Sequence, residues 1–399
     1  MNPTPAPPEF SKEAAAEILS ALVAIPSLNP FGDSARSGPE YTEGRVADWI
    51  AERLSAAGCQ VTRQWVLPGR PNVLACLPGR DRTRTLLLET HMDTVQPATG
   101  MRDPFTPVRR NERIYGLGAC DAKASLTAMI LAMEWAAAGP PPPTDVLFAA
   151  VVDEEYGFRG VRHLIASGVA ATAGVVGEPT ECRIVIAHKG CLRWKVETRG
   201  RAAHASRPDE GVSAIRGMCR LIAGVEEGLA AAWAERAHPL TGPPTFNVGT
   251  IRGGLQANIV ADRCEIDVDR RLIPGETSQG ALAEFEAHAR RAVAEMPGLE
   301  VVIHPPYLDD LPMALPADAP IVEEAKAAVI AAAGEPDVVG APYGTDASKL
   351  TAAGIDTIVL GPGSITDAHS ASESISLEQL VLAARIYAAL VARGAPASA

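Results

Sequence analysis

The stretch TLLLETHMDTV, residues 85–95, joins a run of apolar residues to a row of ionisable ones. Residues 86–88 are three consecutive leucines with short flanks, a pattern typical of a strand that is covered on both faces. Three ionisable residues then occupy alternate positions, and alternate positions on a strand point to the same side; they are Glu89, His91 and Asp93. The stretch therefore predicts a core strand that ends in a cluster of charge.

The bulk properties of the chain limit the classes of protein to which it can belong. Its 399 residues favour two domains over a single core. A formal net charge of -12 argues against nucleic acid or an anionic membrane as the main partner. The seven cysteines are scattered and form no CxxC pair, which is the usage of a reducing compartment. Because no apolar leader or membrane-length apolar run is present, we expect a cytoplasmic location.

The order of predicted elements divides the chain into three parts. Strands alternate with helices over residues 1–183 and again over 310–399, which predicts an α/β domain with a mostly parallel sheet and helices on both faces. Residues 184–309 read differently, as two adjacent alternating strands (183–190 and 191–200), a helix, two strands, a helix and a strand. This is the pattern of an α+β unit with an antiparallel sheet. We therefore predict one α/β domain interrupted by an inserted α+β domain at residues 184–309.

Acidic and histidine residues gather at the predicted carboxyl ends of strands or in the loops that follow them. The segments are ETHMDT, GLGACDAK, VVDEEYG, VGEPT and GPGSITDAHS. In open α/β sheets this edge is where sites are built. Each segment also has a plain structural reading when taken alone, as a polar strand end, a helix N-cap or a solvated loop. Glu89 in particular is read as structural, with a salt bridge as one way to hold it.

The segment GLGACDAK has a second possible reading, as a dinucleotide-binding loop. Gly116 and Gly118 match the first two glycines of that fingerprint, but the third glycine position is Asp121, whose charge would repel a pyrophosphate. The glycines are better explained by a tight backbone turn that places Asp121 at the start of a helix, where its charge is favoured.

Taken together, five of these residues form a mixed set of nitrogen and oxygen ligands such as Zn²⁺ accepts: His91, Asp121, Glu155, Glu178 and His369. Three ligating carboxylates and two dications leave one positive charge, which an ionised Glu154 would cancel. Asp93 is placed to fix the tautomer of the ligating imidazole. Two such ions can activate a water and polarise a carbonyl, whereas the HExxH helix and the P-loop are absent from the sequence.

The ordered set HMDTV, YGLGACDAK, DEEYGFRG, GEPT and GPGSITDAH resembles the aminoacylase-like zinc metallopeptidases. This family includes acetylornithine deacetylase, succinyl-diaminopimelate desuccinylase, aminoacylase and glutamate-releasing carboxypeptidases, and the segments RDPFTP and LGPGS are most like the first of these. The resemblance implies a zinc-dependent, exopeptidase-like α/β catalytic domain with an inserted ferredoxin-like domain. That inserted domain would act as a lid and as the interface of a homodimer.

The resemblance also implies a role for each residue of the charged cluster. Asp121 would bridge two zinc ions per subunit, for which Co²⁺ or Mn²⁺ can substitute. His91 and Glu178 would complete one metal site, and Glu155 and His369 the other. Glu154 would be the general base, and Asp93 would orient the imidazole of the first site.

Five further site residues come from the resemblance alone. His204, in GRAAHAS, would reach across the dimer to stabilise the oxyanion, although a lone histidine there is otherwise a surface residue. Asn258 and Arg271 would bind substrate, and an arginine pairs well with a carboxylate. A salt bridge of Arg271 with Asp267 or Asp269 is the alternative. Gly344 and Thr345, in YGTDASKL, would also contact substrate.

The predicted activity is hydrolysis of the amide that links a small acyl group to an amino acid. The sequence leaves open which acyl group and which amino acid are recognised. A dipeptidase, a glutamate-releasing carboxypeptidase and an N-carbamoyl amidohydrolase on the same scaffold are alternatives. A descendant that binds a ligand without catalysis is an alternative from another class.

Overall fold

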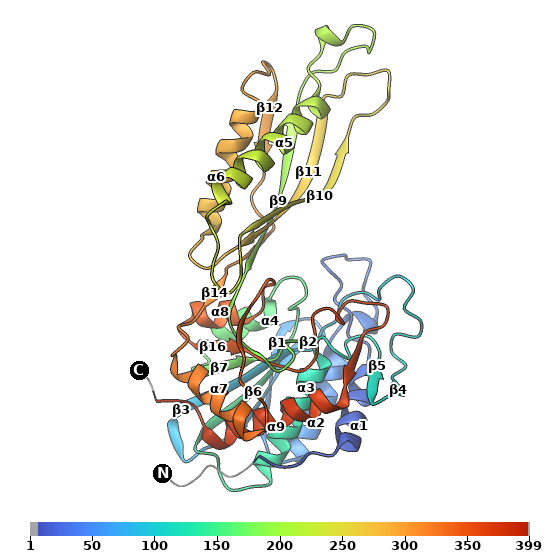
Figure 1. Ribbon diagram of the computed structural model, residues 1–399. Helices are drawn as coiled ribbons and strands as arrows, with labels where there is room; N and C mark the ends of the chain where they lie inside the picture. The colour runs from blue at the N-terminus through green and yellow to red at the C-terminus, as the bar shows by residue number, and fades with distance from the viewer. Residues whose placement is uncertain (1–6, 398–399) are drawn as a thin grey trace. The chain divides into compact units, whose positions relative to one another are not determined.

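A computed structural model of the chain describes residues 7–397 and divides into two compact units (Figure 1). Unit 1 contains the chain up to Ile186, Leu315–Val339 and the chain from Thr345, while unit 2 contains Ala187–Ala314 and Gly340–Gly344. The predicted insertion at residues 184–309 thus begins and ends a few residues earlier than unit 2 does. No helix within residues 7–397 is both long and apolar enough to cross a membrane.

The larger sheet is a mixed β-sheet of nine strands and lies mostly in unit 1. The central neighbours pair in parallel and the outer ones antiparallel, so the parallel part is smaller than the sequence predicts. In order across the sheet, the strands are β1 (Gln60–Leu67), β2 (Arg70–Leu77), β6 (Thr144–Val151), β3 (Asp81–His91), β7 (Ala173–Val176), β16 (Asp356–Val359), β8 (Ile184–His188) and β14 (Met313–Ala314), with β15 (Val338–Ala341) also paired to β8.

Strand β3 is the core strand predicted from TLLLETHMDTV. Its three leucines, residues 86–88, are fully buried. The strand runs parallel to β6, with His91 level with Val151, and parallel to β7, with Glu89 level with Val176. The carboxyl ends of the three strands therefore meet at one edge of the sheet, as the sequence predicts.

Helices cover both faces of this sheet (Figure 1). On one face pack α1 (Lys12–Val23), α2 (Gly44–Ala56), α3 (Lys123–Ala137), α7 (Pro320–Ala331) and α9 (Leu377–Arg393). On the other face lie α4 (Arg159–Ala166) and α8 (Ala347–Ala352). The start of α1 follows the prediction, because the Ser11 hydroxyl accepts a hydrogen bond from the Ala14 amide at 3.0 Å.

A second, small sheet in unit 1 has no clear signal in the sequence. Its strands pair antiparallel in the order β17 (Ser374–Ser376), β5 (Arg113–Tyr115) and β4 (Val108–Arg110). The pairing of β17 with β5 joins two distant segments, because β17 follows His369 closely and β5 precedes Asp121 closely.

Unit 2 has the α+β pattern that the sequence predicts. Its elements along the chain are β9 (Gly190–Arg199), α5 (Ala214–Trp233), β10 (Thr245–Gly253), β11 (Arg263–Leu272), α6 (Ser278–Ala292), β12 (Glu300–Ile303) and β13 (Leu308–Asp310). The strand order is β10-β11-β9-β12, antiparallel throughout, with β13 also paired to β9. Strand–helix–strand–strand–helix–strand in this order is a ferredoxin-like arrangement.

One predicted pairing is wrong. The strands predicted at 183–190 and 191–200 were expected to be neighbours in the inserted domain, but β8 joins the nine-stranded sheet and β9 the five-stranded one. All five residues of β8 are buried, so its burial does not alternate as was expected. A strand that is covered on both faces needs a continuous apolar run, which IVIA supplies.

The core of unit 2 is centred on Trp194, which is fully buried. Its ring meets the ring of Phe285 edge to face, with centroids 5.1 Å apart, and Phe285 in turn stacks on Phe246 at 5.9 Å. Such aromatic pairs stabilise a core beyond the area that they bury.

Replacing the central tryptophan tests the assignment of this core. We expect Trp194→Ala to lower the free energy of unfolding by about 3–5 kcal/mol, because it leaves a large cavity. Urea denaturation followed by far-UV circular dichroism measures the change. Trp65→Ala is the matched control, because Trp65 is 65% exposed and its removal should change stability by no more than about 0.5 kcal/mol. Equal stability of the two variants would contradict the assignment.

Candidate metal centre

The carboxyl ends of four neighbouring parallel strands supply most of the candidate ligands. His91 is the last residue of β3, and Glu154 and Glu155 follow the end of β6. Glu178 follows β7, and His369 lies in the loop after β16. The sixth residue of the cluster, Asp121, lies just before α3. The structure brings these residues together as the sequence predicts.

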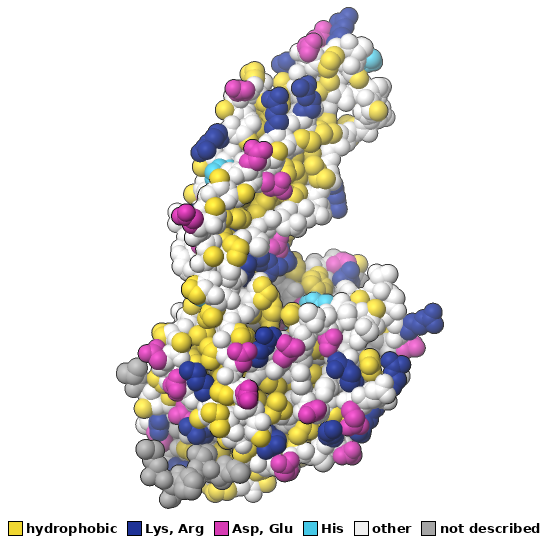
Figure 2. Space-filling view, viewed as in Figure 1, with side chains coloured by type: hydrophobic (Ala, Val, Ile, Leu, Met, Phe, Trp, Pro, Cys, Tyr) yellow, Lys and Arg dark blue, Asp and Glu magenta, His cyan; other side chains and the backbone are white. Residues whose placement is uncertain are grey.

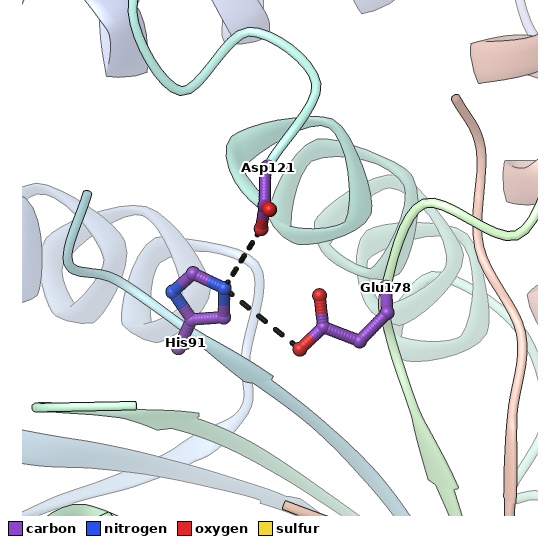
Figure 3. A group of neighbouring side chains, drawn as sticks. All are labelled: His91, Asp121 and Glu178. Carbon is purple, nitrogen blue, oxygen red and sulfur yellow. Dashed lines mark hydrogen bonds and ion pairs between the residues drawn. The ribbon is translucent and has the colours of Figure 1, made fainter. Parts of the chain in front are cut away.

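The first group of ligands consists of His91, Asp121 and Glu178, whose ligand atoms all lie within 4.8 Å of one another. Figure 3 shows the imidazole directed at both carboxylates. Its Nε2 atom lies 3.1 Å from Asp121 Oδ1 and 3.8 Å from Glu178 Oε1. All three side chains are buried, so the group is held in place and shielded from water.

The second group consists of Asp121, Glu155 and His369, again with ligand atoms within 4.8 Å of one another. His369 Nε2 lies 3.2 Å from Glu155 Oε1 and 3.4 Å from Asp121 Oδ2. Asp121 thus faces one histidine with Oδ1 and the other with Oδ2. That geometry suits a carboxylate shared between two metal ions.

The pKa shifts of the cluster indicate that it holds more negative than positive charge. Burial, reinforced by the charge of Glu178, raises the pKa of Glu154 well above its usual range. Burial likewise raises the pKa of Glu178. Burial alone would lower the pKa of His91, but the nearby carboxylates outweigh it and raise that pKa. Hydrogen bonds to Asp121 and Glu155 raise the pKa of His369 to about 11.

These shifts provide a test of whether the site fits metal ions. Without another cation, the cluster holds extra protons on its histidines and glutamates, since buried like charges repel. A multiply charged cation would replace those protons, because metal ligands bind in their deprotonated forms. Both groups offer imidazole nitrogen and carboxylate oxygen, the donors that Zn²⁺ accepts. The residues present therefore fit a pair of divalent ions.

Asp93 supports the cluster in two ways. Its backbone carbonyl accepts a hydrogen bond from His91 Nδ1 at 2.9 Å, whereas its carboxylate lies 3.6 Å from the same nitrogen. The carboxylate also accepts hydrogen bonds from two backbone amides, those of Glu154 at 3.1 Å and Glu155 at 3.2 Å. Asp93 therefore orients the imidazole chiefly through its main chain, and its side chain holds the loop after β6.

Asn29 ties this loop to a wider buried network. Its Nδ2 atom donates to Asp93 Oδ2 at 2.8 Å and to Asp153 Oδ1 at 3.0 Å. Asp153, which precedes Glu154 and has a left-handed φ of 67°, also pairs with Arg70 at 3.2 Å and Arg159 at 2.5 Å. The conformation of the loop is thus set by partners that lie far away in the sequence.

The position of Glu178 is set by its attachment to β3. The Gly177 amide donates to the Glu89 carbonyl at 2.8 Å, and the Thr90 hydroxyl donates to the Gly177 carbonyl at 2.9 Å. A Cβ atom added to Gly177 would lie 2.7 Å from the Cβ of Ser125, so a larger residue has no room here. Helix α3 therefore closes on the turn that carries Glu178.

The loop before α3 depends on its glycines, as the sequence predicts. Gly118 has a φ of 75°, and a Cβ added there would lie 2.6 Å from Thr94 Cγ2. Such a backbone favours glycine. The peptide bond between Asp121 and Ala122 is cis.

Glu89 is buried near the carboxyl end of β3, and the salt bridge considered for it is not present: within residues 7–397, no lysine or arginine pairs with it. Its ionisable neighbours are instead mostly acids. Burial, with Asp346 and Glu178 nearby, raises the pKa of Glu89 well above its usual range. The protonated form is therefore favoured, although neither carboxyl oxygen has a hydrogen-bond partner in the part of the chain that the structure describes.

The remaining predicted site residues are mostly in unit 2. His204 is exposed there, with Nδ1 2.7 Å from Ser206 Oγ, and it lies beside Asn258, since the Ala205 amide donates to the Asn258 carbonyl at 3.0 Å. Arg271 pairs with Asp269 at 2.9 Å, which is the alternative considered for it. The catalytic and substrate-binding roles of these residues stay predictions.

The other two predicted substrate contacts are adjacent in sequence but fall in different units. Gly344 belongs to unit 2, whereas Thr345 belongs to unit 1 and is buried there. The Thr345 hydroxyl accepts a hydrogen bond from the Ala347 amide at 3.2 Å. Their roles toward substrate also stay predictions.

The sequence did not reveal the buried residues that support the loops of the cluster through hydrogen bonds and ion pairs. Asn29 and Arg70 are of types that are common in turns and surface ion pairs, and Glu373 lies outside every predicted site segment. Asp153 lies within VVDEEYG, but the sequence assigns it no role. Their burial is the feature that sets them apart, since a buried polar group needs partners. Burial of this kind has no local sequence signal.

Comparison with known proteins identifies the family of the chain. Residues 87–393 match the protein family described as Peptidase family M20/M25/M40. The chain is 31% identical over 355 residues to acetylornithine deacetylase from Myxococcus xanthus, covering 87% of this chain and 91% of that protein. It is 28% identical over 404 residues to N-formyl-4-amino-5-aminomethyl-2-methylpyrimidine deformylase from Halalkalibacterium halodurans, covering 93% of this chain and 92% of that protein.

A solved structure shares the fold. The Bacillus subtilis YxeP protein, described as a dinuclear metal binding peptidase of the M20 family, aligns with a TM-score of 0.72 and 15% identity, covering 96% of this chain and 98% of that one. The family match covers more than half of the chain and includes all the candidate ligands. The chain therefore belongs to peptidase family M20/M25/M40, whose peptidases and deacetylases are hydrolases of amide bonds.

Proposed function

We propose that this chain is a two-metal amidohydrolase that removes a small acyl group from an N-acyl amino acid. The similarity to a deacetylase and to a deformylase supports a small acyl group, because both names describe the loss of one. A dipeptidase, a carboxypeptidase and an N-carbamoyl amidohydrolase remain the alternatives on the same scaffold.

One observation carries the proposal. Asp121 directs one carboxylate oxygen to each of two histidines, His91 and His369, and each histidine has a glutamate beside it. Glu154 belongs to neither group of ligands, although its backbone is held next to Glu155 by Asp93. This arrangement supports two metal ions with a carboxylate left over for proton transfer.

The metal ions, most suitably Zn²⁺, would be held by the two groups and would supply a Lewis acid for the amide carbonyl and a water of lowered pKa. Glu154 takes a proton from the attacking water and returns it to the amine that leaves. Asp93 keeps the His91 ring in one orientation and keeps the backbone of Glu154 in place. His204 serves as a hydrogen-bond donor to the oxyanion.

Unit 2 is proposed to act as the lid and to supply substrate contacts through Asn258 and Arg271, with Gly344 and Thr345 at the return of the chain to unit 1. Arg271 would bind the carboxylate of the amino acid, for which its guanidinium has the right shape. Asp269 would then hold the arginine in position through the ion pair at 2.9 Å.

We also propose a homodimer formed through unit 2, in a reducing, cytoplasmic location. Strand β10 is an edge strand of the unit 2 sheet and is largely exposed, so its backbone is free to pair with a second copy. Exposed apolar side chains lie near it, including Ile251 and Leu255, the latter 85% exposed. Figure 2 shows hydrophobic side chains among the charged ones on the visible face of unit 2. All seven cysteines are free thiols.

A panel of substrates tests the proposed activity. With Zn²⁺ or Co²⁺ supplied, we expect amine release to be fastest from N-acetyl or N-formyl amino acids and slower from N-succinyl, N-carbamoyl and dipeptide substrates. The measurement is the rate of free amine formation for each compound. Preference for a dipeptide or a carbamoyl substrate would select one of the alternatives. No release from any compound by a protein with metal bound would favour a binding function.

Removing the proposed general base tests the mechanism. We expect Glu154→Ala to lower kcat by about 10²- to 10⁴-fold, because proton transfer by a positioned side chain contributes about that much. Its metal content should stay near that of the wild type, since Glu154 belongs to neither ligand group. Glu52→Ala, on the exposed side of α2, is the control and should keep full activity. Full activity in Glu154→Ala would exclude this residue as the base.

Removing the metal tests the centre itself. Dialysis against a chelator should abolish hydrolysis, and addition of Zn²⁺ or Co²⁺ should restore it, because the proposed reaction needs a Lewis acid. Metal analysis before and after dialysis should show two ions bound and then lost. Hydrolysis that continues at the same rate in metal-free protein would contradict the proposal.

A further inference from the structure

Glu373 is a buried carboxylate that contacts the loop carrying Asp121. Its Oε1 atom accepts hydrogen bonds from the backbone amides of Cys120 at 3.0 Å and Asp121 at 3.1 Å. Its Oε2 atom accepts one from the Gly118 amide at 3.0 Å. The side chain is 1% exposed, and its three partners lie more than 250 residues away along the chain. A single carboxylate thus satisfies three backbone donors of a tight loop.

The same two segments are joined at several other points. The Gly116 amide donates to the Glu373 carbonyl at 3.2 Å. Arg113 Nη2 bonds to Asp367 Oδ2 at 2.8 Å, and its Nε bonds to Ser374 Oγ at 3.0 Å. Strands β17 and β5 continue this attachment as an antiparallel pair. The segment that contains His369 is therefore fastened to the segment that contains Asp121 on both sides of Glu373.

The chemistry of the contact requires a carboxylate. Three backbone N–H groups converge on two oxygens, and an ionised carboxyl group offers acceptors alone. Alanine at 373 would leave all three buried donors without a partner, which is costly in a buried site. Glutamine would keep one oxygen for Cys120 and Asp121, but its amino group would face the N–H of Gly118.

We propose that Glu373 is a positioning residue that holds the Asp121 and His369 loops together and thereby retains the metal ion bound by Asp121, Glu155 and His369. The inference rests on the metal centre proposed above. It predicts an unequal effect on the two ions. The other group draws two ligands, His91 and Glu178, from the ends of β3 and β7, so it depends on Glu373 through Asp121 alone.

A metal titration tests this role without measuring activity. Metal-free, full-length protein is titrated with Co²⁺ and followed by visible absorption and calorimetry, and the wild type should bind two ions. We expect Glu373→Ala to weaken one ion by about 10- to 100-fold and the other much less, since residues that support ligands contribute about this much to affinity. Glu373→Gln should lie between the wild type and Glu373→Ala, because it keeps an acceptor for two of the three amides.

Two reference variants make the result decisive. His369→Ala removes a ligand of one group and so identifies which titration step belongs to it; Glu373→Ala should weaken that same step. Glu378→Gln changes an exposed glutamate five residues further on and should bind both ions like the wild type. Circular dichroism of the metal-free variants checks their fold, and if Glu373→Ala fails to fold, Glu373→Gln carries the comparison.

The possible results distinguish a failure of the role of Glu373 from a failure of the proposed metal centre. Two ions bound to Glu373→Ala as tightly as to the wild type would overturn the role of Glu373, and so would an equal loss of both ions. A wild-type chain that takes up no Co²⁺ would instead overturn the proposed metal centre, and the role of Glu373 with it.

Discussion

The parallel pairing of β3 with β6 on one side and with β7 on the other is the constraint on which the site depends. It sets His91 level with Val151 and Glu89 level with Val176, so the loops that follow β6 and β7 begin beside the histidine. A slip of one residue would turn the imidazole to the opposite face of the sheet. The buried leucines at 86–88 anchor the strand in the core, since each contributes roughly 1.5–3 kcal/mol by its burial. The pairing with β6 and β7 sets the register of the charged end of the strand.

The same register concentrates acids where water is excluded. Glu154, Glu155 and Glu178 are brought to one edge of the sheet, and burial raises the pKa of each. An unpaired buried charge is costly, and a fold that only needed stability would place apolar residues here. Acids gathered at the ends of parallel strands are better explained by cations that bind between them. The cost of burying these acids and the membership of the chain in peptidase family M20/M25/M40 therefore both indicate a metal centre.

The sequence located the candidate ligands more readily than the residues that support them. His91, Asp121 and Glu178 each follow a strand or a glycine turn, so local patterns locate them and the rule for sheet edges brings them together. Asn29 and Glu373 act through hydrogen bonds to partners 64 to 255 residues away, and no local pattern encodes such contacts. The error over β8 has a similar origin, because strands that are neighbours in the sequence were assumed to be neighbours in a sheet.

Different supporting contacts hold different parts of the cluster. Asn29 and Asp93 join the end of β3 to the loop with the two glutamates, and Thr90 joins β3 to the turn that carries Glu178. Glu373 joins the loop of Asp121 to its own segment, four residues after His369. Backbone hydrogen bonds thus position Asp121 and Glu155 directly and Glu178 through its neighbour Gly177.

Positioning through the backbone affects how the site responds to protonation, metal binding and substitution. A side chain positioned through its backbone keeps its place whether it is protonated or bound to a metal, so the geometry can exist before the ion arrives. A rigid set of ligands of this kind is what a metal site needs from its scaffold. Because the fixing contacts come from different segments, loss of any one should loosen its own part of the cluster and leave the parallel strands, and the ligands that they carry, in register.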